Sequence, residues 1–249
     1  MNQLRHTGYI KKEQEKMSKR YTIANGFLSY LGCMDEVSLC TKGEFIGEKT
    51  PHFFPDPLFT TLSIYDKVIT PEKFNPFKHE QDLDLQSGVL RRKTSFQLPT
   101  TIIEVESIRF VDQEDPHFIY SSFSFSSTNS CTLDLHTGID TLPFELSDNA
   151  SVFGDESILS FYDPHQFNYI EKMVDTSFKD KPAAVINNGL NFHYHLSVEA
   201  GKVYTVNQYV YVGQEKINHT GLNTKRSEGF KSLLRANKKW WKIKLDKAS

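Results

Sequence analysis

Two histidines that lie two residues apart have the spacing best suited to metal chemistry in this sequence. His193 and His195 belong to the alternating segment Asn191–Glu199, so a strand there would place both imidazoles on one face. Such a pair can share one Zn²⁺ ion if a third ligand, for instance His136, comes from another strand. The alternative is a pair of surface histidines opposite an apolar core face. We favour this alternative and expect no metal site.

Carboxylates are the second group of side chains that could do chemistry. A glycosidase needs two of them at a defined separation in space, which one sequence does not give. Glu104 and Glu106 alternate with Ile103 and Val105, a pattern typical of a solvated strand face. The sequence contains no glycine-rich phosphate loop and no nucleophile elbow. We therefore predict no catalytic, cofactor-binding or metal-binding residue, and no cofactor.

The cysteines and the N-terminus indicate a compartment. Cys33, Cys40 and Cys131 are an odd number at spacings that form no metal knuckle, which favours reduced thiols in the cytoplasm. Residues 1–20 are polar and lack the apolar region of a signal peptide, and no apolar run approaches 18 residues. We expect a cytoplasmic protein with no membrane partner.

Length and composition indicate one large β domain. The chain has 249 residues, of which 13% are aromatic, including 19 Phe. Aromatic enrichment favours strands, and all-β domains commonly reach 200–250 residues. The formal net charge of −2 provides no overall field that would attract nucleic acid.

Two turn motifs predict β-hairpins. Asn25-Gly26 interrupts two apolar runs, which is a strong indication of a hairpin. Ser87-Gly88 lies in the middle of Asp82–Arg92, where Gly88 can adopt a positive φ without a Cβ penalty. Both motifs predict antiparallel pairs of short strands.

Extended segments fill much of the remaining chain. Clusters of Gly, Pro, Asn and Asp separate them, and no helical periodicity intervenes. The segments are Thr101–Val111, Phe118–Ser126, Cys131–His136, Asn191–Glu199 and Lys202–Val212. This arrangement predicts a sandwich of antiparallel sheets over residues 1–224.

Two stretches do not fit a simple strand pattern. Residues 1–20 offer little to bury, so we expect a frayed arm or an edge contact. Residues 45–79 interleave five prolines with six phenylalanines, and that proline density excludes central strands from much of the stretch. Either this stretch packs under its own aromatic side chains or it reaches toward a partner.

The pattern becomes helical at the end of the chain. Apolar residues recur at helical spacing after Ser227, the expected N-cap, and include Trp240 and Trp241. Residues 225–247 carry nine basic and two acidic side chains. A nucleic-acid surface and a solvated helix face are both compatible with this excess. We favour the solvated face and expect no nucleic-acid partner, because no recognised nucleic-acid fold accompanies the helix.

Five elements follow one another along the chain: Tyr21–Leu28, Leu83–Arg91, Ser107–Phe110 with His117-Phe118, Thr137–Asp140, and the helix bearing Trp240 and Trp241. In this order they resemble the amino-terminal domain of glycoside hydrolase family 65. Tyr21–Leu28 resembles the opening motif of that domain, and Leu83–Arg91 resembles its Leu-Asp-Leu-x-x-Gly-Val-Leu-x-Arg element, one residue tighter before the arginine. The chain departs from the family pattern at Ala24, Ser29 and Leu31, and residues 45–79 do not match it.

The resemblance implies a large β-sandwich of the galactose mutarotase-like supersandwich type. It also implies a linker helix, residues 225–249, that leads toward an (α/α)₆ catalytic barrel outside this chain. The parent reaction would be inverting phosphorolysis of a glucose disaccharide such as maltose, trehalose or kojibiose. Its general acid and phosphate-binding residues would lie in the barrel, so the resemblance assigns no catalytic residue here.

Three hypotheses follow, of which the first leads. The chain is a non-catalytic domain of a disaccharide phosphorylase, a stand-alone mutarotase-like enzyme, or a carbohydrate-binding module. In the first case the partners would be the catalytic barrel and, for the isolated chain, a second copy in a homodimer. Part of the helix face would lack its cover, so we expect Trp240 and Trp241 to be disordered or to pack against a neighbouring copy.

Overall fold

The structure is a computed structural model. It describes residues 3–37, 43–46, 52–141, 151–154, 158–163, 168–179, 183–186, 190–217 and 219–248. Cys40 lies outside the described residues. Every strand pairing within these ranges is antiparallel, as the alternating segments predicted.

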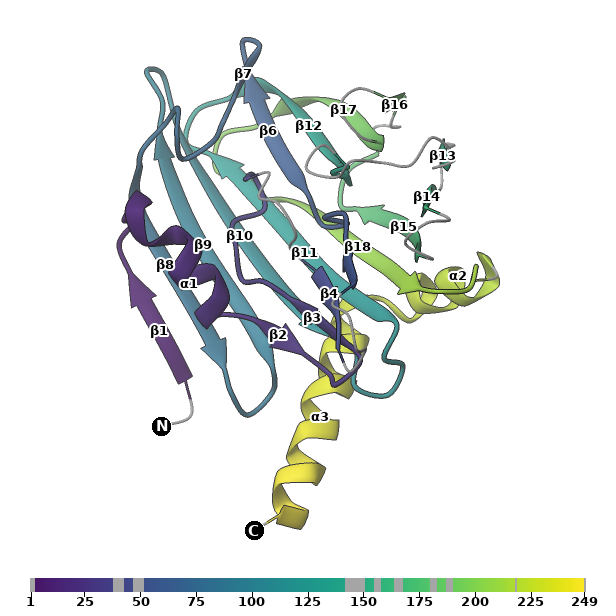
Figure 1. The fold of residues 1–249 in the computed structure, drawn as a ribbon. Helices are drawn as coiled ribbons and strands as arrows, with labels where there is room; N and C mark the ends of the chain where they lie inside the picture. Colours follow the sequence, from purple (N-terminus) through teal and green to yellow (C-terminus); the bar gives the residue numbers. More distant parts are fainter. Residues whose placement is uncertain are drawn as a thin grey trace.

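The described strands form three sheets (Figure 1). The nine-stranded sheet has the order β1 (Gln3–Thr7), β8 (Pro76–Asp84), β9 (Val89–Gln97), β10 (Ile102–Val111), β11 (Phe118–Ser127), β18 (Tyr204–Gly213), β15 (Asn168–Thr176), β14 (Leu159–Asp163) and β13 (Ser151–Gly154). The five-stranded sheet has the order β16 (Ala183–Ile186), β17 (Leu190–Val198), β12 (Cys131–Ile139), β6 (Thr60–Ile64) and β7 (Lys67–Val68). The four-stranded sheet consists of β2 (Ile23–Ala24), β3 (Leu28–Tyr30), β4 (Gly43–Phe45) and β5 (His52–Phe54).

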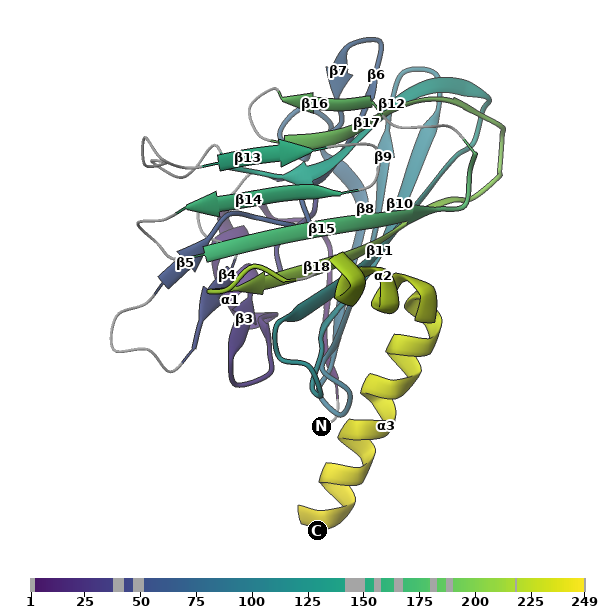
Figure 2. The ribbon, with the colours of Figure 1, turned by 90° about the vertical axis from the view of Figure 1, so that its right-hand side faces the viewer.

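The nine-stranded sheet separates two apolar clusters. Its inner face and the two smaller sheets enclose the main core, to which Phe96, Phe123 and Val206 contribute. Its outer face carries a second, smaller cluster under the helices α2 (His219–Glu228) and α3 (Phe230–Ala248). Figure 2 shows these helices on one side of the sheet and β3–β5 on the other. The prediction of an antiparallel β-sandwich with a C-terminal helix is confirmed.

Both predicted hairpins are present. β2 pairs with β3 around Gly26, which has a φ of 91°, and β8 pairs with β9 around Gly88, which has a φ of 60°. The alternation in β17 also has the expected effect, because Phe192, Tyr194 and Leu196 are all buried. Local turn chemistry and period-two patterning therefore determine these elements.

The proline-rich stretch packs largely against the core. Phe45 and Phe54 are buried, whereas Phe53 and Phe77 are exposed. The expectation excluded central strands from much of this stretch, and β6, which pairs with both β12 and β7, is a central strand within it. The physical reason is that residues 58–70 contain no proline, so β6 retains every backbone N–H that its ladders require.

The N-terminal residues contribute an edge strand and a helix. β1 pairs with β8 over five residues, which confirms the edge contact. The helix α1 (Gln14–Arg20), preceded by a 3₁₀ turn at Lys11–Glu13, buries Met17 and Ser18. Sequence patterning missed this helix because its seven residues contain only one apolar side chain.

The C-terminal segment contains two helices, which corrects the expected single helix of residues 225–249. α2 begins at residue 219, and Gly229, with a φ of 78°, separates it from α3. Ser227 is not an N-cap, because it lies inside α2 and its hydroxyl donates to the Asn223 carbonyl at 2.8 Å. No helix among the described residues is long and apolar enough to cross a membrane.

Candidate functional site

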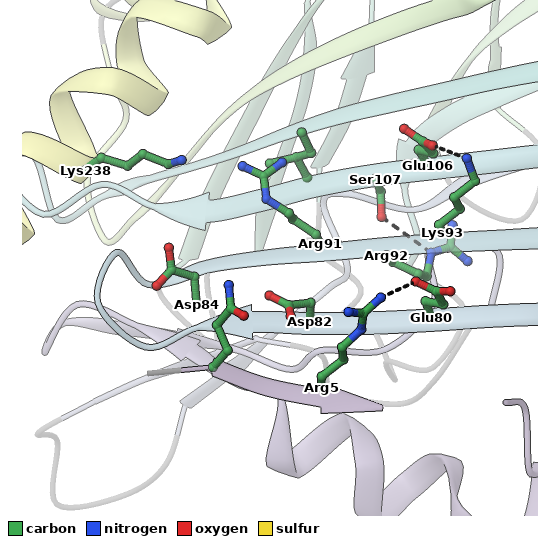
Figure 3. Close-up of a pocket in the computed structure, with 12 residues that line it drawn as sticks. Arg5, Glu80, Asp82, Asp84, Arg91, Arg92, Lys93, Glu106, Ser107 and Lys238 are labelled. Carbon is green, nitrogen blue, oxygen red and sulfur yellow. Dashed lines mark hydrogen bonds and ion pairs between the residues drawn. The ribbon is translucent and has the colours of Figure 1, made fainter. Parts of the chain in front are cut away.

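Near β1, the outer face of the nine-stranded sheet carries charged side chains whose sign alternates from one strand to the next. Basic Arg5 on β1 faces acidic Glu80 and Asp82 on β8, which in turn face basic Lys93 and Arg91 on β9. Glu106 on β10 continues the alternation opposite Lys93. Figure 3 shows these side chains projecting from neighbouring strands, with Lys238 of α3 at the margin. We call this surface the striped face.

The striped face forms an open groove with a volume of about 490 Å³. Two ion pairs cross it, Arg5–Glu80 at 2.9 Å and Lys93–Glu106 at 2.7 Å, and all four side chains are more than half exposed. The hydrogen bond from Lys93 to Glu106 raises the lysine pKa, and the charge of Glu106 adds to this effect. Exposed pairs of this kind contribute at most about 1 kcal/mol to stability. Glu106 therefore belongs to a solvated strand face, as the sequence indicated.

The α3 helix borders the striped face and contacts the β8–β9 turn. The side-chain amide of Asn237 donates to the Ser87 carbonyl at 2.8 Å. The Trp241 indole lies against Gly88, where an added Cβ would stand only 3.0 Å from the indole nitrogen. Glycine at position 88 thus serves both the turn and the close approach of the helix. The two tryptophans are half-buried, so the first expected alternative, disorder, is not met, and packing against a neighbouring copy stays a prediction.

The three histidines named from the sequence lie together on the small sheet. His136 on β12 is directly opposite His193 on β17, and their rings stack at 4.3 Å between centroids. Asp134 lies opposite His195, and its Oδ1 atom is 3.1 Å from His193 Nε2 and 2.7 Å from His195 Nδ1. Sequence analysis missed Asp134, although its two-residue spacing from His136 placed both on one strand face.

Burial and proximity shift two pKa values in this cluster. Burial lowers the pKa of His136, and the charge of neighbouring His193 lowers it further. Burial alone would raise the pKa of Asp134, but the hydrogen bonds from His195 and His193 outweigh this effect and lower it. As the side chains stand, no group of three or more His, Cys, Asp or Glu among the described residues is arranged to hold a metal ion.

A buried ion-pair network lies inside the sandwich. Arg92 on β9 makes two hydrogen bonds to Glu36, at 2.6 and 2.9 Å, and contacts Asp35 Oδ2 at 2.8 Å. Arg109 on β10 contacts the same Asp35 oxygen at 2.9 Å. All four side chains are no more than 1% exposed. This network joins the loop after β3 to the inner face of the large sheet, so its role is structural.

A buried lysine lies elsewhere on that inner face. Lys172 on β15 donates to Thr137 Oγ1 at 3.0 Å and to the Gly138 carbonyl at 2.9 Å. Burial lowers its pKa to about 7, although the charges of Asp56 and Asp35 oppose the change. These contacts connect the two large sheets across the core.

These features together define an antiparallel β-sandwich whose outer face carries a helical extension beside a charged, open groove. The chain belongs to the glycosyl hydrolase family 65 N-terminal domain family, whose model matches residues 52–243. The family resemblance is thus confirmed, and Leu83–Arg91 and the three later motifs lie within the matched residues, whereas Tyr21–Leu28 lies before them.

Two similar proteins are described as disaccharide phosphorylases. A nigerose phosphorylase of Lachnoclostridium phytofermentans (strain ATCC 700394 / DSM 18823 / ISDg) is 28% identical over 131 residues, which are 49% of this chain and 17% of that protein. A structure described as a kojibiose phosphorylase from the human microbiome superposes with a TM-score of 0.80 at 15% identity. That match covers 97% of this chain and 37% of the other. The chain therefore spans well under half the length of both relatives.

Proposed function

We propose that this chain is the non-catalytic N-terminal β-sandwich domain of a disaccharide phosphorylase. Family membership and the descriptions of the two relatives support this proposal. The parent reaction would be inverting phosphorolysis of a glucose disaccharide. Maltose, trehalose and kojibiose remain candidate substrates, of which a relative's name supports kojibiose, and nigerose joins them because the other relative carries that name. In such a reaction an acid protonates the leaving oxygen while phosphate attacks the anomeric carbon.

The domain's own residues support a scaffold role rather than a chemical one. The carboxylates of the striped face lie in an open groove, and basic side chains alternate with them. A general acid of this type needs a site whose environment raises its pKa, which burial commonly provides. An exposed and charge-balanced face is better suited to meeting a complementary protein surface.

The observation that carries the proposal is that α3 is apolar on two sides. Successive helical residues turn by about 100°, so Ile243 lies roughly 200° around the helix from Trp241. Trp241 contacts the hairpin of the sandwich, while Ile243 points away from it and is 44% exposed. Figures 1 and 2 both show this part of α3 projecting beyond the sheet. A helix between two packed bodies requires apolar side chains of this kind, and we assign the second body to the catalytic barrel.

The first test is enzymatic. We expect the purified chain to release no glucose 1-phosphate from maltose, trehalose, kojibiose or nigerose in the presence of phosphate. The full-length nigerose phosphorylase of Lachnoclostridium phytofermentans serves as the positive control for nigerose. Chain-dependent release above the blank would contradict the non-catalytic assignment.

The second test concerns the outward side of α3. Without a barrel to cover Ile243, we expect the isolated chain to self-associate in sedimentation experiments, because exposed apolar surface tends to find partners. Ile243→Lys should shift the population toward monomer. The exposed neighbour Lys242 provides the control, since Lys242→Ala removes no apolar contact. Association that is unchanged in Ile243→Lys, or a wild-type chain that stays monomeric at every concentration, would remove this support for docking through α3.

A further inference from the structure

Three histidines and one aspartate, residue types that can ligate metal ions, form a two-by-two array on the small sheet. The register pairs His136 with His193 and Asp134 with His195. Their neighbours Leu133 and Leu135 on β12, like Tyr194 and Leu196 on β17, are buried in the core. Side chains alternate between the faces of a strand, so all four polar groups project from the outer face. Antiparallel pairing thus supplies the ligand from another strand that the His193–His195 pair requires.

One donor atom of His193 and one of His195 lie close to the same oxygen of Asp134. Asp134 Oδ1 is 3.1 Å from His193 Nε2 and 2.7 Å from His195 Nδ1. Zinc bonds of about 2.0–2.1 Å in tetrahedral geometry place neighbouring donors roughly 3.3 Å apart. The two contacts would have to lengthen by only about 0.2–0.6 Å to reach that separation. They are hydrogen bonds now, and the proton in each occupies part of the space that a metal ion would take.

The side chains that must move have room to do so. The His195 side chain is 70% exposed, and those of His193 and Asp134 are 31% and 25% exposed. His193 is held more firmly, because the ring of His136 stacks on it with an interplanar angle of 3°. The stacked pair fixes one ligand, and the exposed His195 can adjust to complete the site.

We propose that Asp134, His193 and His195 bind one Zn²⁺ or a similar divalent transition-metal ion. Water would take the fourth position, and His136 would act as a positioning residue for His193. Two imidazoles and one carboxylate are a ligand set suited to such ions. This site lies on the five-stranded sheet, whereas α3 and the striped face lie on the outer side of the nine-stranded sheet. The proposal is therefore independent of the phosphorylase assignment.

Titration calorimetry with Zn²⁺ alone tests the proposal. We expect the wild-type chain to bind one equivalent, and His193→Ala, His195→Ala and the isosteric Asp134→Asn each to weaken binding at least about tenfold. His6→Ala is the matched control, because His6 lies on β1 of the other sheet and should leave the affinity unchanged. Far-ultraviolet circular dichroism checks that each variant is folded.

Substitution with Co²⁺ gives a second readout, because the visible spectrum of the bound ion reports its coordination geometry. A tetrahedral site of nitrogen and oxygen ligands should produce intense visible d–d absorption, which Asp134→Asn and His195→Ala should abolish. Absence of Zn²⁺ binding by the wild-type chain would overturn the proposal. Binding that survives in all three ligand variants, or that is lost in His6→Ala, would overturn it equally.

Discussion

Asp35→Ala is expected to lower the free energy of unfolding by about 3–5 kcal/mol, as is typical when one partner of a buried ion pair is removed. A single oxygen of Asp35 contacts both Arg92 and Arg109, and no other carboxylate contacts Arg109 in the ion pairs of the described residues. Burial alone would lower the pKa of Arg109, but the charge of Asp35 and neighbouring groups outweighs this and raises it. The guanidinium thus stays charged, and the variant would leave that charge buried without its counter-ion.

Urea unfolding of matched variants measures this effect. Asp35→Asn keeps the volume and removes the charge, so it should cost nearly as much as Asp35→Ala. Glu80→Ala breaks the half-exposed pair with Arg5 and should cost less than about 1 kcal/mol. The double variant Asp35→Leu, Arg109→Met should regain much of the loss, because buried ion pairs can often be replaced by apolar groups. If Asp35→Ala were no more harmful than Glu80→Ala, the network would not have the structural role assigned to it.

The sequence could predict the strands of this fold but not which buried charges pair between them. In β9, Leu90, Arg92, Thr94 and Phe96 share the inner face. The apolar residues at both ends of that set mark the face as buried, so Arg92 could have been identified as an inward-facing charge. Its partner Glu36 lies 56 residues earlier in a loop with no periodic pattern. Contacts of that range depend on the topology of the sheets, which local patterning does not encode.

In the candidate sites too, local alternation predicts which side chains share a strand face, whereas their partners depend on how distant strands pair. Alternation within Asn191–Glu199 correctly placed His193 and His195 on one outward face, and the residue types indicated the chemistry. Their pairing with His136 and Asp134 depends on the register of β12 against β17. Residues 140–189 separate these two strands, and no tight turn fixes their register. The striped face has a similar origin, since only the order β1-β8-β9-β10 brings its charges into alternation.

Lys172→Met is expected to stabilise the domain at pH 6, by about 1–4 kcal/mol if it follows the range seen when buried ion pairs are replaced by apolar side chains. Lys172 is 0% exposed, and both of its hydrogen-bond acceptors are uncharged. Its pKa falls to about 7 from an ordinary value of 10.5, which shows that the folded interior disfavours the ammonium form. Thr137 would retain Thr60 and Gln208 as partners in the variant, so only the Gly138 carbonyl would lose its side-chain donor.

The wild type and Lys172→Met should differ in free energy of unfolding by an amount that depends on pH. This pH dependence is the sharper observable. Between about pH 7 and pH 10.5 the unfolded chain keeps the Lys172 proton that the folded chain has released. Since the unfolded state then binds more protons, wild-type stability rises with pH in this window by up to about 1.4 kcal/mol per pH unit from this group. Lys172→Met lacks that contribution, so its advantage should be largest below pH 7 and should shrink or reverse by pH 9. Urea unfolding at pH 6 and pH 9 measures the change, with the exposed Lys93→Met as the control. If the difference in free energy of unfolding between the wild type and Lys172→Met were the same at pH 6 and pH 9, the buried amine would not be neutral in the folded protein near pH 9.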